Sequence, residues 1–141
     1  MKAAEILGDH NLKRTSCRED IIKAIMGSDV ALSTDEIRKR MAGDYDRTTL
    51  YRSFKTLESS HILHKIVVDG QTVKYALGDT GPENPGHVHF YCNKCHTVIC
   101  LEDVPNLKYD LPDGFSYNET DVLIKGICPR CREKGEDDAE N

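Results

Sequence analysis

Two pairs of cysteines carry the strongest chemical signal in the sequence. Each has the form Cys-x-x-Cys, with Cys92 and Cys95 in the first pair and Cys128 and Cys131 in the second. A two-residue spacer lets both thiolates of a pair point at one ion, and two such pairs complete a tetrahedral shell. We therefore expect one structural zinc ion per chain, held by four cysteines. Buried or disulfide-bonded cysteines are the alternative, which a chain without a secretory signal does not favour.

The distance between the pairs is also informative. Thirty-two residues separate Cys95 from Cys128, whereas compact zinc ribbons separate their pairs by about 15–20. The intervening chain must form structure of its own and return to the metal. The ion is expected to fix the last strand of a small subdomain to its first hairpin, so metal binding contributes to its folding free energy.

Charge is distributed unevenly along the 141 residues. Residues 1–77 hold 13 Lys and Arg against 11 Asp and Glu, which gives +2, while residues 78–141 hold 6 against 13, which gives −7. The net charge of −5 therefore does not exclude a nucleic-acid partner for the first half. No apolar run is long enough to span a membrane. The six cysteines are expected to be reduced thiols in the cytoplasm.

The first half shows the pattern of a winged helix-turn-helix. Ser16 and Ser33 are each followed three residues later by a glutamate, a capping box that predicts a helix start. Asp46 is predicted to cap a third helix over residues 47–59. Two apolar segments around an Asp-Gly turn then predict a β-hairpin over residues 62–77. Three helices followed by a hairpin wing place the third helix in the DNA major groove.

The third predicted helix has two different faces. Leu50, Phe54 and Leu57 form an apolar stripe at helical spacing, which is expected to face the core. The remaining surface carries cations, hydroxyls and an aromatic ring that suit base edges and phosphates: Thr48, Thr49, Tyr51, Arg52 and Lys55. An ordinary solvated helix face is the alternative.

Residues 78–86 contain two prolines and three glycines without a large apolar residue, which predicts a hinge. Residues 1–77 before it form the expected winged-helix domain. Residues 87–134 after it form the expected zinc-stapled domain. The acidic tail, residues 135–141, is predicted to be disordered.

With these segments in place, the sequence from about Leu12 to Cys131 resembles the ferric uptake regulator (Fur) superfamily of bacterial metal-dependent repressors. The resemblance is carried by Leu12-Lys13 with Thr15 and Arg18, by Thr48-Thr49-Leu50-Tyr51-Arg52, by the wing, and by His87-x-His89-Phe90-x-Cys92-x-x-Cys95 with Cys128-x-x-Cys131. It implies an α+β fold with an N-terminal winged helix-turn-helix domain and a small C-terminal α/β dimerisation domain containing the four-cysteine zinc site. It also implies a homodimer that binds palindromic double-stranded DNA as a repressor.

The resemblance assigns roles to residues outside the cysteine site. Tyr51 and Arg52 match the contacts of the recognition helix, and Lys13 and Arg18 match positions that touch the groove edge or the backbone. The family's long dimerisation helix is expected to be shortened here, to about Val104–Leu111, by flanking prolines.

The second, regulatory metal site of the family is altered in this sequence. His87 and His89 match its two histidines, but the positions of an early histidine, a wing-end acid and a later acid fall on Ala31, Ala76 and Cys100. Two imidazoles alone hold a transition metal weakly. His87, His89 and Cys100 are therefore candidate ligands of a second transition metal of unknown identity. Loss of this site is the alternative.

Three other functions compete with DNA-binding regulation. An enzyme would need a third ligand and a general base beside His87 and His89, which no motif supplies, so we expect no enzymatic activity. A zinc-stabilised protein-interaction module could retain the fold without the DNA role. A thiol redox sensor could use Cys100 or Cys17, which lies at a helix start where the N-terminal dipole lowers the pKa of a thiol. A partly buried, inert Cys17 is the expected alternative. His64 is expected to be an ordinary surface residue.

Overall fold

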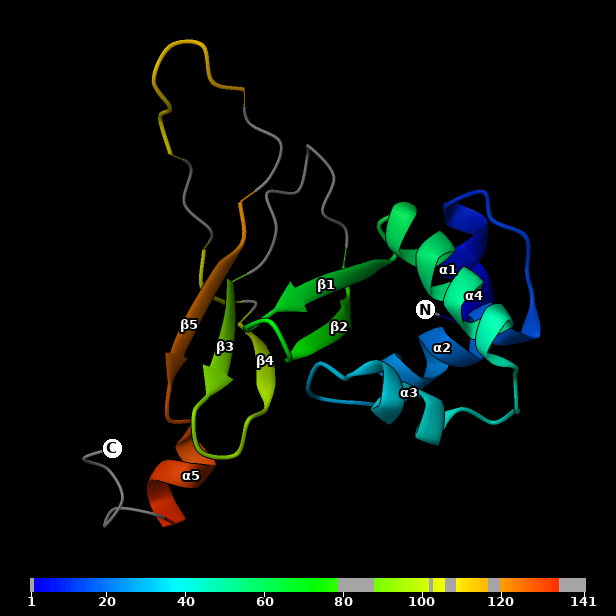
Figure 1. The fold of residues 1–141 in the computed structure, drawn as a ribbon, viewed down its shortest axis with the longest axis horizontal. Helices are drawn as coiled ribbons and strands as arrows, with labels where there is room; N and C mark the ends of the chain where they lie inside the picture. Colours follow the sequence, from blue (N-terminus) through cyan, green and yellow to red (C-terminus); the bar gives the residue numbers. More distant parts are fainter. Residues whose placement is uncertain (1, 79–87, 102, 106–108, 117–119, 135–141) are drawn as a thin grey trace.

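A computed structural model describes residues 2–78, 88–101, 103–105, 109–116 and 120–134 (Figure 1). Most of the predicted hinge, the acidic tail and His87 lie outside the described residues. We call residues 2–78 the N-terminal half and residues 88–134 the C-terminal half. None of the described helices combines the length and apolarity that crossing a lipid bilayer requires.

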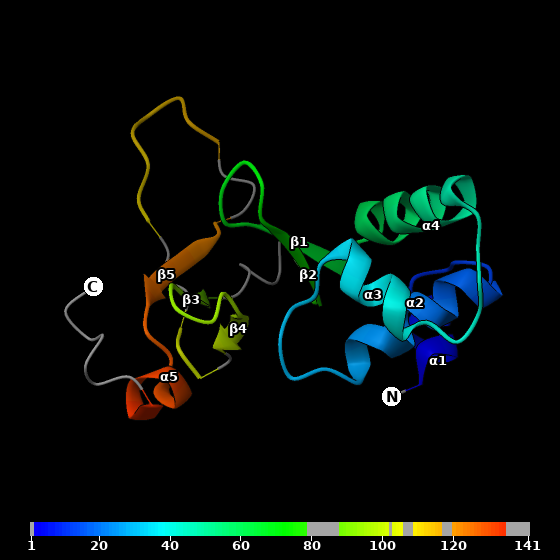
Figure 2. The same cartoon turned by 60° about the horizontal axis from the view of Figure 1, so that its bottom comes forward.

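Helices come first along the chain and two small sheets follow. The elements are α1 Ala3–Asp9, α2 Ser16–Met26, α3 Thr34–Arg40, α4 Arg47–Ser59, β1 Leu63–Val67, β2 Val73–Leu77, β3 Val88–Cys92, β4 Val98–Leu101, β5 Val122–Gly126 and α5 Pro129–Lys134. In Figures 1 and 2 the β1–β2 wing lies between the helices on one side and the three-stranded sheet on the other. The predicted order of three helices and a wing is present, and α1 precedes it.

Two of the three predicted helix caps are confirmed. The Ser33 hydroxyl accepts the Glu36 N–H at 3.2 Å, and the Ser33 N–H donates to Glu36 Oε1 at 2.8 Å, which completes the capping box of α3. Asp46 Oδ1 accepts the Thr49 N–H at 2.8 Å at the start of α4. Glu36 Oε1 also accepts from Lys74 Nζ at 2.8 Å. The cap of α3 therefore holds the wing as well.

The predicted cap of α2 is wrong by one residue. The N-cap is Thr15, whose hydroxyl accepts the Arg18 N–H at 3.2 Å, and Ser16 is the first helical residue. With Thr15 as the N-cap, the third helical residue is Arg18 and not Glu19, and the Glu19 carboxylate instead lies 3.0 Å from Arg14 Nε. An ion pair has replaced the reciprocal bond that the sequence pattern predicted.

One apolar core unites the N-terminal half. It is built mainly from helix side chains that are almost completely buried: Leu7, Ile21, Ile22, Leu32, Ile37 and Leu57. In α4, Phe54 and Leu57 are buried and Leu50 packs against the same core, which confirms the predicted inward stripe. The core fixes the direction in which the opposite face of α4 points.

The C-terminal half is a sheet of order β4-β3-β5, antiparallel between β3 and β4 and parallel between β3 and β5. Its side chains alternate between two faces. Val98, Tyr91 and Leu123 pack with Ala31, Ile66 and Val68 of the N-terminal half. The Ala31 N–H donates to the Val98 carbonyl at 2.8 Å. The opposite face carries Phe90 and Ile99, which pack beside the cysteines.

The predicted short helix over Val104–Leu111 is wrong for its described residues. Val104, Pro105 and Tyr109–Leu111 have no helical structure. Proline lacks a backbone donor and clashes with the preceding turn, so Pro105 and Pro112 oppose a helix here. Residues 109–116, which we call the arm, extend away from the sheet at the N-terminal end of β5 (Figure 1).

Candidate metal centre and nucleic-acid interface

The four cysteines converge from three places in the C-terminal half. Cys92 ends β3, Cys95 follows in the turn to β4, Cys128 directly precedes α5, and Cys131 lies within α5. Their sulfur atoms all lie within 4.8 Å of one another. The 3.8 Å from Cys95 Sγ to Cys128 Sγ matches the edge of a tetrahedron with zinc–sulfur bonds of about 2.3 Å. It is far too long for a disulfide, at about 2.05 Å.

Backbone donors prepare this cluster for a cation. Cys92 Sγ accepts N–H bonds from Cys95 and Cys128, both at 3.4 Å. Burial opposes ionisation of Cys92, but these N–H groups outweigh it and lower its pKa to about 6. Burial and the neighbouring cysteines raise the pKa of Cys131 to about 12. Four thiolates therefore need a cation among them, and the donor set fits a thiophilic metal such as zinc.

The exposed face of α4 carries five of the side chains predicted to contact DNA. Thr48, Thr49, Tyr51, Arg52 and Lys55 are all exposed, and 62% of Tyr51 is accessible. Lys55 Nζ lies 5.8 Å from the centre of the Tyr51 ring, which is a cation–π distance. These side chains project from a helix whose other face is fixed in the core.

A cleft of about 360 Å³ between the start of α2 and α4 brings three predicted contacts together, since Arg18, Thr49 and Arg52 line it. Arg18 also donates to the Lys13 carbonyl at 2.7 Å. Lys13, which precedes α2, is thereby held beside the same cleft.

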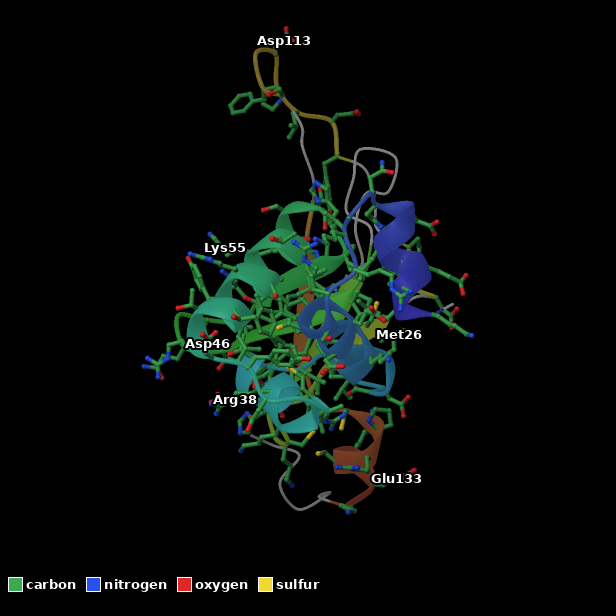
Figure 3. All side chains as sticks on the ribbon, turned by 90° about the vertical axis from the view of Figure 1, so that its right-hand side faces the viewer. Met26, Arg38, Asp46, Lys55, Asp113 and Glu133 are labelled. Atoms are coloured by element: carbon green, nitrogen blue, oxygen red, sulfur yellow. The ribbon has the colours of Figure 1, made fainter. Side chains whose placement is uncertain are left out.

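A second cleft, of about 480 Å³, lies between α3, α4 and the wing. Tyr51 and Lys55 line it together with Arg38, Arg47 and Lys65. The sequence pattern of α4 alone does not single out Arg38, Arg47 or Lys65 as DNA contacts. Lys65 could have been found from the alternation of buried and exposed side chains in β1, where it occupies an exposed position. Figure 3 shows Lys55 and Arg38 along the same side of the molecule.

Histidines meet where the two halves of the protein pack together. His89 is 2% exposed and lies directly across from Cys100 in the β3–β4 register. The expectation that His64 is a surface residue is wrong. Its ring is buried and stacked on that of His89, with 5.2 Å between ring centres. His64 Nε2 also lies 3.4 Å from Asp121 Oδ1.

The altered regulatory positions lie around one cavity between the halves. Ala31, Ala76 and Cys100 line this space of about 360 Å³. Ala31 and Ala76 also belong to the apolar cluster that joins the halves. Within the described residues, only the four cysteines bring three or more metal-ligating atoms within 4.8 Å of one another. His89 and Cys100 are neighbours there without forming such a group.

Cys17 is a buried thiol, as the inert alternative to a redox sensor expected. Burial raises the pKa of this thiol, against a hydrogen bond with Ser53 that lowers it. Its position in the first turn of α2 does not offset its desolvation. Cys17 is packed in the core and does not have the exposed, activated thiolate that a redox sensor needs.

A winged helix joined to a sheet with a four-cysteine cluster defines a class of metal-binding, DNA-binding proteins. Comparison of the sequence with known families narrows this class. The profile of the Ferric uptake regulator family matches residues 9–113, so the chain belongs to this family. Its members are transcriptional regulators that bind operator DNA as dimers and are not enzymes, in agreement with the non-enzymatic role expected from the sequence.

Individual relatives extend this agreement over almost the whole chain. The chain is 26% identical over 137 residues to the ferric uptake regulation protein of Staphylococcus epidermidis, covering 94% of this chain and 95% of the relative. Its identity to the Staphylococcus aureus protein is also 26%, over 136 residues, with 93% and 96% covered.

Solved structures share the fold at lower identity. A zinc uptake regulator complexed with zinc and DNA has a TM-score of 0.67 at 19% identity, covering 95% of this chain and 93% of that one. The Vibrio cholerae ferric uptake regulator has a TM-score of 0.61 at 18% identity, with 88% and 98% covered.

Proposed function

We propose that this protein is a sequence-specific transcriptional repressor that binds a palindromic operator as a homodimer. The observation that carries the proposal is the outer face of α4. Tyr51, Arg52 and Lys55 are exposed on a helix that Phe54 and Leu57 anchor in the core. Residues 1–77 are assigned to DNA reading, residues 87–134 to dimerisation and residues 78–86 to the connection between them. The core of the N-terminal half and the separate sheet of the C-terminal half support this division.

The DNA contacts divide into base and backbone contacts. Tyr51 and Arg52 are assigned to base edges, where arginine suits guanine and an aromatic ring contacts thymine methyl groups. Lys13, Arg18 and Lys55 are assigned to phosphates, with Thr48 and Thr49 as hydroxyl donors. The cleft shared by Arg18 and Arg52 supports placing a DNA strand between α2 and α4.

Cys92, Cys95, Cys128 and Cys131 are assigned to one structural zinc ion. The sulfur spacing and the N–H bonds to Cys92 Sγ support this choice. When bound, zinc supplies a closed tetrahedral link that ties α5 to the β3–β4 turn. It has no open position for catalysis.

The regulatory site is proposed to be degenerate. His87, His89 and Cys100 are the remaining candidate ligands for a second transition metal. Alanines stand at positions 31 and 76, and their packing in the junction between the halves supports loss of the full ligand set. We expect no saturable metal beyond the four-cysteine ion.

Native mass spectrometry tests the metal assignments. The protein is measured as purified and then after additions of Zn²⁺, Fe²⁺ and Mn²⁺. A dimer with one zinc ion per chain is the expected result. A second saturable ion per chain would show that the regulatory site still works, and a metal-free monomer would contradict the structural zinc.

Selection of duplexes from a random DNA pool tests the DNA role. We expect enrichment of a palindrome and affinity that falls steeply with salt, because phosphate contacts release counterions. The Arg52→Ala variant should lose base discrimination. A protein that retains no duplex at low salt would instead be an interaction module.

A further inference from the structure

The two halves of the protein are joined through the backbone of the segment between α2 and α3. Leu32 and Tyr75 of β2 exchange two hydrogen bonds, with N–O distances of 3.0 and 2.7 Å. Ala31, the residue before, donates its N–H to the Val98 carbonyl of β4 at 2.8 Å. Residues 31 and 32 therefore link the wing on one side to the three-stranded sheet on the other.

Apolar side chains from both halves close the space around this link. The N-terminal half contributes Ala31, Ile66 and Val68, which are between 5% and 8% exposed. On the other side, each strand of the sheet contributes one side chain: Tyr91, Val98 and Leu123. Packing of this kind depends on the removal of apolar surface from water and not on the concentration of an ion.

The stacked histidines make a further contact across the junction. His64 belongs to β1 and His89 to β3, and both rings are buried, with 5.2 Å between their centres. His89 is one of the candidate metal ligands, and its ring packs against the wing. Asp121, the residue before β5, lies 3.4 Å from His64 Nε2. The wing is therefore held by contacts along the whole width of the sheet.

The reading helix is tied to this junction through the wing. Phe54 of α4 and Tyr75 of β2 lie with their ring centres 5.6 Å apart, and Tyr75 is the residue that bonds Leu32. A shift of the sheet relative to the wing would therefore act on α4 as well. In Figures 1 and 2, α4 lies on the far side of the wing from the three-stranded sheet, so the junction leaves the outer face of α4 uncovered.

We propose that this junction is a built-in lock, which holds α4 in a fixed position relative to the sheet without a second metal ion. The methyl groups of Ala31 and Ala76 have no lone pair to bind a metal, and they pack in the junction instead. Operator affinity should therefore not respond to added metal once the four-cysteine site is filled. This proposal rests on the proposed homodimer and operator, and it specifies how the altered regulatory positions act.

Hydrogen exchange at the Ala31 amide of the zinc-loaded full chain tests the lock directly. Mass spectrometry with fragmentation that resolves single residues measures it. The bond to the Val98 carbonyl should slow the exchange. We expect equal protection after a chelator has removed weakly bound ions and after addition of Zn²⁺, Fe²⁺ or Mn²⁺. Protection that appears only after a metal is added would refute the lock.

Two neighbouring valines provide a matched pair of variants. Val68 is 8% exposed and packs in the junction, whereas Val67 is 56% exposed. Val68→Asn should expose the Ala31 amide to exchange, because burying an amide without a partner opposes the packing. Val67→Asn introduces the same uncharged side chain one residue away and should leave that protection unchanged.

The same pair tests the effect of the lock on DNA binding. Val68→Asn should weaken binding to the selected palindrome about tenfold to a hundredfold, because two reading helices without a fixed spacing lose effective concentration. Its affinity for a duplex with a single half-site should stay within about twofold of the wild type, since Val68 lies outside the core that anchors α4. Val67→Asn should leave the ratio of the two affinities unchanged.

Fluorescence anisotropy of the wild type on the palindrome should give the same affinity with the chelator and with each metal. A rise of about tenfold or more on addition of a metal would refute the lock and leave DNA reading intact. An unchanged ratio of affinities in Val68→Asn would refute the role of the junction. A protein with a protected Ala31 amide that selects no duplex would uphold the lock and refute DNA reading.

Discussion

Substitution of Cys92 by serine should unfold the C-terminal half and leave the N-terminal half folded. Cys92 is fully buried, and its sulfur accepts two backbone N–H bonds. Among the described residues, the apolar cluster around it contains, besides the cysteines, Phe90, Ile99 and Ile127, all partly buried. These three side chains contribute at most about 9 kcal/mol, at up to about 3 kcal/mol each. A structural zinc ion contributes about 10–16 kcal/mol in small domains.

The loss is therefore comparable with the typical stability of a whole protein, about 5–15 kcal/mol. Hydrogen exchange measured by mass spectrometry should show lost amide protection in β3 and β5 and retained protection in α2 and α4. Elemental analysis should show loss of the single bound ion. The matched control is Cys100→Ser, which changes a half-buried thiol outside the cluster. Retained protection in β5 without a bound ion would refute the argument that the metal replaces a core.

Three further predictions concern the N-terminal half. Arg52→Ala should weaken specific DNA binding about tenfold to a hundredfold. Lys55→Ala should mainly reduce the slope of log affinity against log salt concentration, by about one unit. Fluorescence anisotropy of labelled duplex across a salt series measures both effects. Glu36→Gln should destabilise the protein to urea by about 0.5–1 kcal/mol, because its pair with Lys74 is partly exposed. Burial opposes ionisation of Glu36, but Lys74 and the helix cap lower its pKa, so this difference should be present above about pH 4.3 and vanish as pH falls through the lowered value. Leu57→Ala, at a fully buried site, should cost about 2–5 kcal/mol in the same assay.

Features with a local cause could be predicted from the sequence. The Ser33 capping box, the Asp46 cap and the two-residue spacing within each cysteine pair each involve residues three positions apart or fewer. Their geometry follows from backbone dimensions alone. The cap of α2 was misplaced because Thr15 and Ser16 are adjacent hydroxyl residues that can each serve as a cap, and Thr15 is the one that accepts the Arg18 N–H. A short motif can therefore be shifted by one residue where two adjacent residues can both act as the cap.

The junction between the halves could not be predicted, because it is assembled from separate segments. His64 comes from β1, His89 from β3 and Asp121 from the residue before β5. The alternation of β1 shows that its side chains face two directions, but it does not reveal that a second sheet covers one of them. The packing of Ala31 and Ala76 could not be predicted either. Comparison with the family shows that these positions lack metal ligands, but it does not show what the alanines contact. In the folded chain they pack against that second sheet, so the positions that lack metal ligands help to hold the two halves together.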